Sequence, residues 1–182
     1  MPKQDPFDSD FFFDMSNQTE EGYLRLPVGK YKAKVVGWDV RKKDNGDISH
    51  WIDFEITEGD FEGEMVRDFE TIKKDKVRTS MQYFTQTIRN LNLVRDPEDR
   101  NAEGKLGFTL EYGPPKDNGA RDVVGVKVNN EVREVLGREG ILVIGHYEDN
   151  AGKKQHSVNG VEHIEEFDPD ESFDNDDIDW PT

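Results

Sequence analysis

Two tryptophans and a group of basic side chains carry the clearest binding chemistry in this sequence. Trp38 and Trp51 occupy two alternating segments on either side of Asn45-Gly46. Rings on one face of paired strands can stack on unpaired bases, while nearby cations contact phosphates. The basic residues expected to serve this surface are Lys32, Lys34, Arg41, Lys42 and Lys43, with Lys73, Lys74 and Lys76 as weaker candidates.

A β-hairpin from residue 30 to residue 57 must position these side chains. Asn45-Gly46 between two alternating apolar segments predicts a two-residue type I′ turn, which needs positive φ at both residues. Because the turn fixes the register, Val35 is expected opposite Ile56 and Asp39 opposite Ile52. These pairs define the face that is expected to point toward the core.

The other face of the predicted hairpin carries both tryptophans. Trp38 is expected opposite Asp53 and Trp51 opposite Val40, so the two rings are diagonal neighbours roughly 7–8 Å apart. A base-stacking surface and a second, minor core are both consistent with this pattern.

A third strand is predicted from residue 64 to residue 72. Either Arg67 and Phe69 point outward and extend the ring surface, or Phe69 lies in the core; the alternation allows both.

The segments after residue 72 predict one helix and further strands. A helix is expected from Asp75, as N-cap, to about Leu91, and its apolar stripe is expected to lie in the core. Strands at about 105–112 and 123–128 form a β insertion spanning about 95–130, and one or two helical turns follow near Val132 to Leu136. A last hairpin pairs residues 141–147 with 155–164. The residues of the helical stripe are Val77, Met81, Phe84, Ile88 and Leu91.

Charge is distributed unevenly along the 182 residues. The net charge is −16, yet residues 23–164 are close to neutral because the acids concentrate in both terminal segments. With 33% hydrophobic and 35% charged residues, we expect residues 1–25 and 165–182 to be disordered extensions of one domain at 26–164. The absence of cysteine excludes disulfides and thiolate metal sites. No signal peptide or membrane span is recognised, which predicts a cytoplasmic protein.

Enzymatic activity is not predicted from these residues. The four histidines, at positions 50, 146, 156 and 163, lack metal-ligand spacing, and no glycine-rich phosphate loop is present. We therefore expect neither a catalytic site nor a cofactor.

The order of elements predicts a fold that is mainly β with one main α-helix. Three strands, a helix and two strands is the order of the OB-fold, a five-stranded Greek-key barrel, here with the β insertion between the helix and strand 4. The segments LPVGKYKAKVVGWDV, DFEITEGDFEGEMVRDFETI and VREVLGREGILVIGHYEDNAGKKQHSVNGVEHI resemble a family of phage-encoded single-stranded DNA-binding proteins. The resemblance covers about residues 26–93 and 132–164.

This resemblance implies sequence-tolerant binding of single-stranded DNA during phage DNA replication, recombination or repair. Trp38, Trp51, Arg67 and Phe69 would contact DNA together with the basic residues named above, and a homo-oligomer is possible. Such proteins commonly pair an OB core with an acidic tail that recruits partner proteins and competes with DNA. The matching tail residues are Asp176, Asp177, Ile178, Asp179, Trp180 and Pro181. The alternative is an acidic interaction module or DNA mimic that inhibits a host nucleic-acid enzyme.

Overall fold

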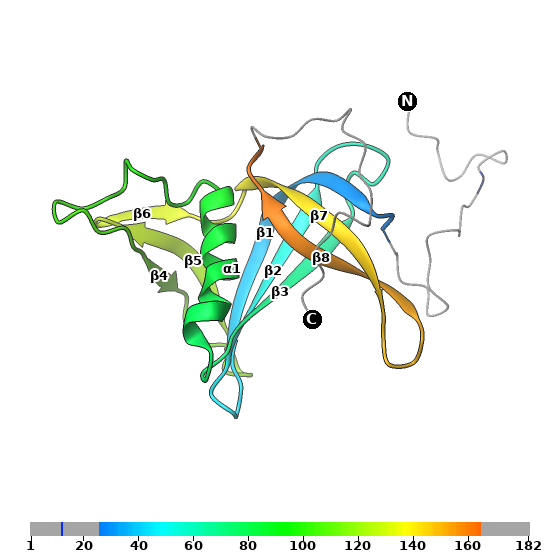
Figure 1. Cartoon of the computed structure of the whole chain (residues 1–182), viewed down its shortest axis with the longest axis horizontal. Helices are drawn as coiled ribbons and strands as arrows, with labels where there is room; N and C mark the ends of the chain where they lie inside the picture. The colour runs from blue at the N-terminus through cyan, green and yellow to red at the C-terminus, as the bar shows by residue number, and fades with distance from the viewer. Residues whose placement is uncertain (1–11, 13–25, 165–182) are drawn as a thin grey trace.

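The computed structural model describes residue 12 and residues 26–164. This part of the chain is mainly β, with a single helix and an open antiparallel sheet (Figure 1). The disorder predicted for 1–25 and 165–182 falls outside the described residues apart from Phe12, and so does the tail motif at 176–181. The elements in chain order are β1 (Gly29–Lys42), β2 (Ile48–Ile56), β3 (Met65–Ile72), α1 (Val77–Asn90), β4 (Thr109–Tyr112), β5 (Arg121–Val128), β6 (Glu131–Glu134), β7 (Glu139–Glu148) and β8 (Lys154–Glu162).

Strand β1 is the centre of the sheet because it pairs with three other strands. It pairs with β2 from Ala33 to Lys42, with β7 through residues 29–34, and with β5 through residues 39 and 40. Strand β3 extends the sheet beyond β2, and β8 extends it beyond β7. No ladder joins β3 to β8 in the described chain, so the sheet is open between these two edges.

The register of the β1–β2 hairpin differs from the predicted one. Val35 lies opposite Phe54 and Trp38 opposite Ile52, with an irregularity between Val35 and Gly37. The turn is a three-residue loop, because the Lys43 amide donates to the Asp47 carbonyl (2.8 Å). Gly46 has a φ of +92°, but Asn45 is not among the described residues with positive φ, so a type I′ turn does not form here. A one-residue slip exchanges the two faces of a strand.

A type I′ turn occurs elsewhere, between β5 and β6. Asn129 and Asn130 have φ values of +49° and +69°, and the flanking residues Val128 and Glu131 pair with each other. The helical turns predicted near Val132 are therefore wrong, because this hairpin places residues 131–134 in a strand.

Helix α1 covers the core at the gap between β3 and β8. The Thr87 hydroxyl donates to Glu70 of β3 (2.5 Å), and the Asn90 amide donates to the Val161 carbonyl of β8 (2.6 Å). Phe84 and Ile88 of the predicted stripe are buried, but Val77 and Met81 are exposed by 45% and 38%. The prediction that the whole stripe is core is thus wrong at its first two positions. The helix begins after Lys76, without a side-chain cap from Asp75.

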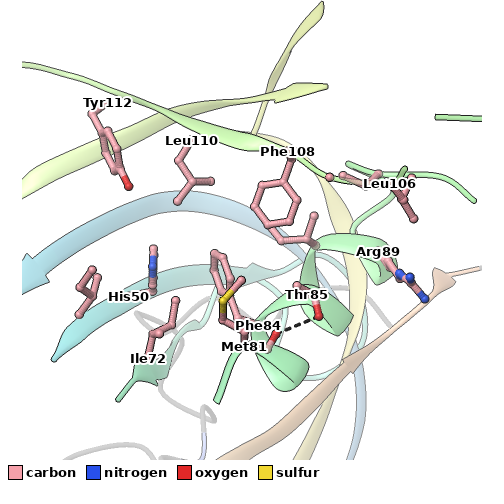
Figure 2. A pocket seen from close by; sticks show the side chains of 14 residues that line it. His50, Ile72, Met81, Phe84, Thr85, Arg89, Leu106, Phe108, Leu110 and Tyr112 are labelled. Atoms are coloured by element: carbon pink, nitrogen blue, oxygen red, sulfur yellow. Dashed lines mark hydrogen bonds between the residues drawn. The ribbon is translucent and has the colours of Figure 1, made fainter. Parts of the chain in front are cut away.

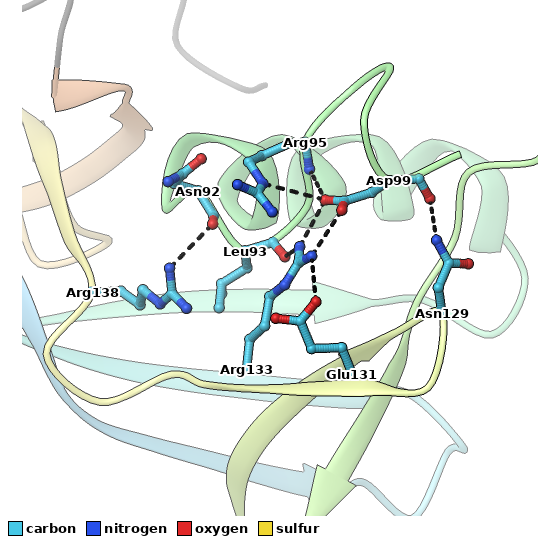
Figure 3. A network of polar contacts seen from close by, with 8 residues as sticks. All are labelled: Asn92, Leu93, Arg95, Asp99, Asn129, Glu131, Arg133 and Arg138. Carbon is cyan, nitrogen blue, oxygen red and sulfur yellow. Dashed lines mark hydrogen bonds and ion pairs between the residues drawn. The ribbon is translucent and has the colours of Figure 1, made fainter. Parts of the chain in front are cut away.

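The insertion consists of β4, β5 and β6, and it lies on the other side of α1 from β7 and β8 in Figure 1. A buried ion pair fastens it to the segment after α1: the Arg133 guanidinium donates to both carboxylate oxygens of Asp99, at 2.7 and 2.8 Å, and to the Leu93 carbonyl at 2.8 Å (Figure 3). Both charged side chains are only 7% exposed. The insertion is therefore joined to the rest of the core by a polar contact as well as by apolar packing.

Candidate nucleic-acid interface

An aromatic pair lies on the outer face of the β1–β3 sheet. Trp51 of β2 is directly opposite Phe69 of β3, and their ring centroids are 5.4 Å apart in an edge-to-face arrangement. Phe69 is 61% exposed and Trp51 is half-buried. The Trp51 indole N–H donates to the Ser49 hydroxyl at 3.0 Å, which fixes the orientation of the indole ring. The two rings therefore lie at adjacent positions on one face, and Phe69 is the more exposed of the two.

Two arginines flank the aromatic pair. The Arg41 guanidinium carbon lies 3.8 Å from the Trp51 ring centroid, and that of Arg67 lies 5.0 Å away. Both distances are within the range of cation–π attraction. Each arginine also has a carboxylate partner, Asp39 at 3.1 Å for Arg41 and Asp53 at 2.6 Å for Arg67. The acids hold the two guanidinium groups beside the rings and partly neutralise their charge.

Four of the predicted site residues thus come together: Arg41, Trp51, Arg67 and Phe69. We call this set the outer-face cluster. The outward orientation of Arg67 and Phe69, one of the two alternatives that alternation left open, is the observed one. Aromatic surface with adjacent cations is the combination that binds single-stranded nucleic acid by stacking and phosphate contact.

Trp38 does not belong to this cluster, so its predicted place on the outer face is wrong. It is 3% exposed, and its indole N–H donates to His50 Nδ1 at 3.0 Å. Its ring packs edge-to-face on Phe84 of α1, with centroids 5.9 Å apart. The one-residue difference in register accounts for this, because it moves Trp38 to the core side and Asp39 to the outer side.

The predicted lysines lie toward the two ends of β1. Lys42 and Lys43 are exposed at the β1–β2 turn, next to Arg41. Lys32 and Lys34 are half-buried in the first half of β1, and Lys34 forms an ion pair with Glu55 at 3.5 Å. Lys34 and Arg41 are seven positions apart along β1, which corresponds to roughly 23 Å. The lysines Lys73, Lys74 and Lys76, exposed before α1, are close in sequence to β3.

A cleft of about 320 Å³ opens where β3 and β8 face each other. Arg67 and Phe69 form one wall of this cleft, and Tyr147 of β7 and residues 156–158 of β8 line the rest. Tyr147 is 48% exposed. The sequence analysis did not select Tyr147, because the segment 141–147 indicates a buried strand without showing which distant strand its last residues approach.

Two neighbouring carboxyl groups, one buried and one half-buried, lie at and behind this cleft. Asp68 lines the cleft and is 7% exposed, and Glu70 follows it on the inner side of β3. Burial raises the pKa of Asp68 to about 7, and burial together with the Asp68 charge raises that of Glu70 to about 8. The pair therefore retains a proton near neutral pH, when an exposed carboxyl group has none.

His50 shows the opposite effect of the same apolar surroundings. Its ring stacks on Phe84 with centroids 4.4 Å apart, and burial lowers its pKa to about 4. The imidazole is neutral at physiological pH, which suits its role as the acceptor for Trp38.

A second groove, about 370 Å³ in volume, lies between α1 and β4 (Figure 2). Phe84 and Met81 of α1 form one side, while Phe108 and Leu110 of the insertion form the other; Arg89 is the charged residue of the lining. This apolar surface results from the insertion, since β4 is placed over the exposed start of the helix. It has the chemistry of a site for apolar side chains, not for a nucleic-acid backbone.

Comparison with known protein families gives a match to part of the chain. The family described as "Protein of unknown function (DUF669)" matches residues 11–95, a segment that includes β1, β2, β3 and α1. The chain is similar to this family over the strands that carry the outer-face cluster. No curated protein matches the sequence.

Two further features bear on the kinds of site present. Within residues 12 and 26–164, no group of three or more histidine and acidic side chains is arranged to hold a metal ion. In the same residues, the helix is too short and too polar to cross a membrane.

Proposed function

We propose that this protein binds single-stranded DNA in a sequence-tolerant manner across the outer face of β1, β2 and β3. The observation that carries the proposal is the outer-face cluster, in which Trp51 and Phe69 are adjacent rings and the guanidinium groups of Arg41 and Arg67 lie over the Trp51 ring. Bases of any identity have a π face, so stacking on these rings does not require a particular sequence.

The arrangement of strands supports the interpretation of this domain as a variant of the OB-fold. Strands β1, β2 and β3 are followed by α1 and then by β7 and β8, and β7 returns to pair with β1. Helix α1 lies between β3 and β8, and strands β4, β5 and β6 form the insertion. In OB-folds the face of strands 2 and 3 and the adjacent loops bind oligonucleotides. By this correspondence the outer-face cluster lies on the binding face.

The charges on this face predict a moderate electrostatic contribution to DNA affinity. Arg41, Lys42, Lys43 and Arg67 are the cations within or next to the cluster, and Asp39 and Asp53 compete with phosphate for the two arginines. If all four cations neutralise a phosphate, log K falls with log[salt] with a slope of about −3, because single strands contribute about −0.7 per contact. A smaller slope indicates that the carboxylates keep their arginine partners in the complex.

The biological setting follows from the resemblance of the sequence. We propose a role in phage DNA replication, recombination or repair in the host cytoplasm, with residues 176–181 recruiting partner proteins. These assignments depend on DNA binding, so binding is the first property to test.

The test is binding of fluorescently labelled oligo-dT by anisotropy at low salt, with the full chain and two variants. Trp51→Ala removes the stacking surface and is expected to weaken binding by about 5- to 100-fold. Trp51→Phe keeps an aromatic ring and serves as the matched control, with a much smaller loss.

Two results contradict the proposal. One is absence of binding by the wild-type chain at low salt, which favours the acidic interaction module. The other is unchanged affinity of Trp51→Ala, which moves the binding surface away from the outer-face cluster.

A further inference from the structure

The cleft between β3 and β8 continues directly from the outer-face cluster. Arg67 and Phe69 belong to both, since their side chains flank Trp51 on one side and line the cleft on the other. A strand of DNA stacked on Trp51 and Phe69 therefore reaches the mouth of this cleft without crossing another element. The cleft has room for further nucleotide contacts at about 320 Å³.

Two exposed aromatic rings belong to opposite walls of the cleft. Phe69 comes from β3 and is 61% exposed, and Tyr147 comes from β7 and is 48% exposed. Covering these rings with a base removes apolar surface from water, which is favourable. Exposed rings on both walls and a cation at the rim are the composition of a site that receives a planar, anionic ligand unit.

The walls of the cleft also supply polar groups. Strands β3 and β8 face each other here without a joining ladder, so their edges present backbone groups to the cleft. Asp68 also lines it and is 7% exposed. The Asp68 carboxyl group supplies acceptor oxygens at the wall of the cleft. Acceptor oxygens can pair with the amino or imino donors on the edge of an unpaired base.

We propose that the cleft between β3 and β8 binds one unpaired base of the DNA strand that continues from Trp51 and Phe69, with Tyr147 stacking on that base. This inference rests on the proposed function. It adds a residue from the last hairpin, more than 75 positions away from Phe69 in sequence, to a site otherwise formed by the first three strands. The DNA-binding surface then extends across the gap between β3 and β8.

The experiment combines variants of the full chain with oligo-dT that carries a single abasic residue at successive positions. Tyr147→Ala is expected to weaken binding to intact oligo-dT by about 5- to 100-fold, while Tyr147→Phe retains nearly the wild-type affinity. With the wild type, an abasic residue at the position that occupies the cleft also weakens binding. With Tyr147→Ala that position becomes insensitive, whereas the positions stacked on Trp51 stay sensitive.

The outcomes separate this inference from the proposed function. If Trp51→Ala weakens binding and Tyr147→Ala does not, the cleft inference is overturned and the proposed function stands. An unchanged abasic profile in Tyr147→Ala, or equal losses in the alanine and phenylalanine variants, also overturns base stacking by this ring. Absence of DNA binding by the wild type overturns both.

Discussion

Replacing Arg133 by methionine is expected to destabilise the protein strongly, because it leaves the buried Asp99 carboxylate without its main partner. Arg133 and Asp99 are each 7% exposed and share two hydrogen bonds of 2.7 and 2.8 Å. Removing one member of a buried ion pair costs about 3–5 kcal/mol. The Asp99 carboxylate keeps the Arg95 backbone N–H as a donor at 2.5 Å, so we expect the lower end, about 3 kcal/mol.

Chemical denaturation of the full chain measures this cost directly. Glu131 contacts the same guanidinium at 3.2 Å but is 66% exposed, so Glu131→Gln is the matched control and should cost less than about 1 kcal/mol. The double variant Arg133→Met with Asp99→Leu removes both charges and should recover most of the loss. A loss below about 1 kcal/mol for Arg133→Met, or no recovery in the double variant, refutes the conclusion that this ion pair fastens the insertion.

The same pair predicts a pH dependence at the acidic end. The Arg133 guanidinium holds the pKa of Asp99 well below its usual range. Since the folded state binds this proton less readily than the unfolded state, the stabilisation is fully present above about pH 5 and decreases as pH falls through the unfolded pKa of about 4. Arg133→Met should therefore show a weaker loss of stability between about pH 5 and pH 2 than the wild type.

Two further predictions concern Glu70 and Gly46. Because the folded state keeps the Glu70 proton up to about pH 8, the stability of the wild type should fall as pH rises from about 4.5 to 8. The stability of Glu70→Gln should fall less over this range. Melting temperatures of the two proteins that change in parallel at pH 5, 7 and 9 contradict this prediction. Gly46 has a φ of +92°, so Gly46→Ala should cost about 1–2 kcal/mol in chemical denaturation. Gly107→Ala is the control, because φ is not positive at Gly107 and no atom lies within 4 Å of the added Cβ. Equal losses of stability in the two variants refute the conclusion that the positive φ of Gly46 causes the cost.

The sequence predicted the elements of the domain better than their pairing. The β1–β2 hairpin, the third strand, the helix after it and the last hairpin all occur close to the expected residues. The register of the first hairpin was not predictable from Asn45-Gly46 alone, because a glycine with positive φ serves both a two-residue and a three-residue loop. The sequence Asn129-Asn130, which forms the type I′ turn between β5 and β6, was the overlooked signal.

This difference in the turn decided which site residues were predicted correctly. Trp51 stays on the outer face in either register, whereas Trp38 changes sides as its partner becomes Ile52. Tyr147 was not predictable at all, because its place in the same cleft as Phe69 depends on the path of β7 and β8 around the sheet. Local alternation contains no information about such long-range proximity.

The most direct test of DNA binding at the outer face of β1, β2 and β3 is an NMR titration of the full, ¹⁵N-labelled chain with oligo-dT. The titration is followed through the indole N–H signals of the three tryptophans. The Trp51 indole is expected to shift on binding, together with amides of β2 and β3. The Trp38 indole, buried and bonded to His50, should stay unchanged. A titration without shifts, or shifts that leave Trp51 and the outer face of β2 and β3 unaffected, contradicts the assignment of this face as the DNA-binding surface.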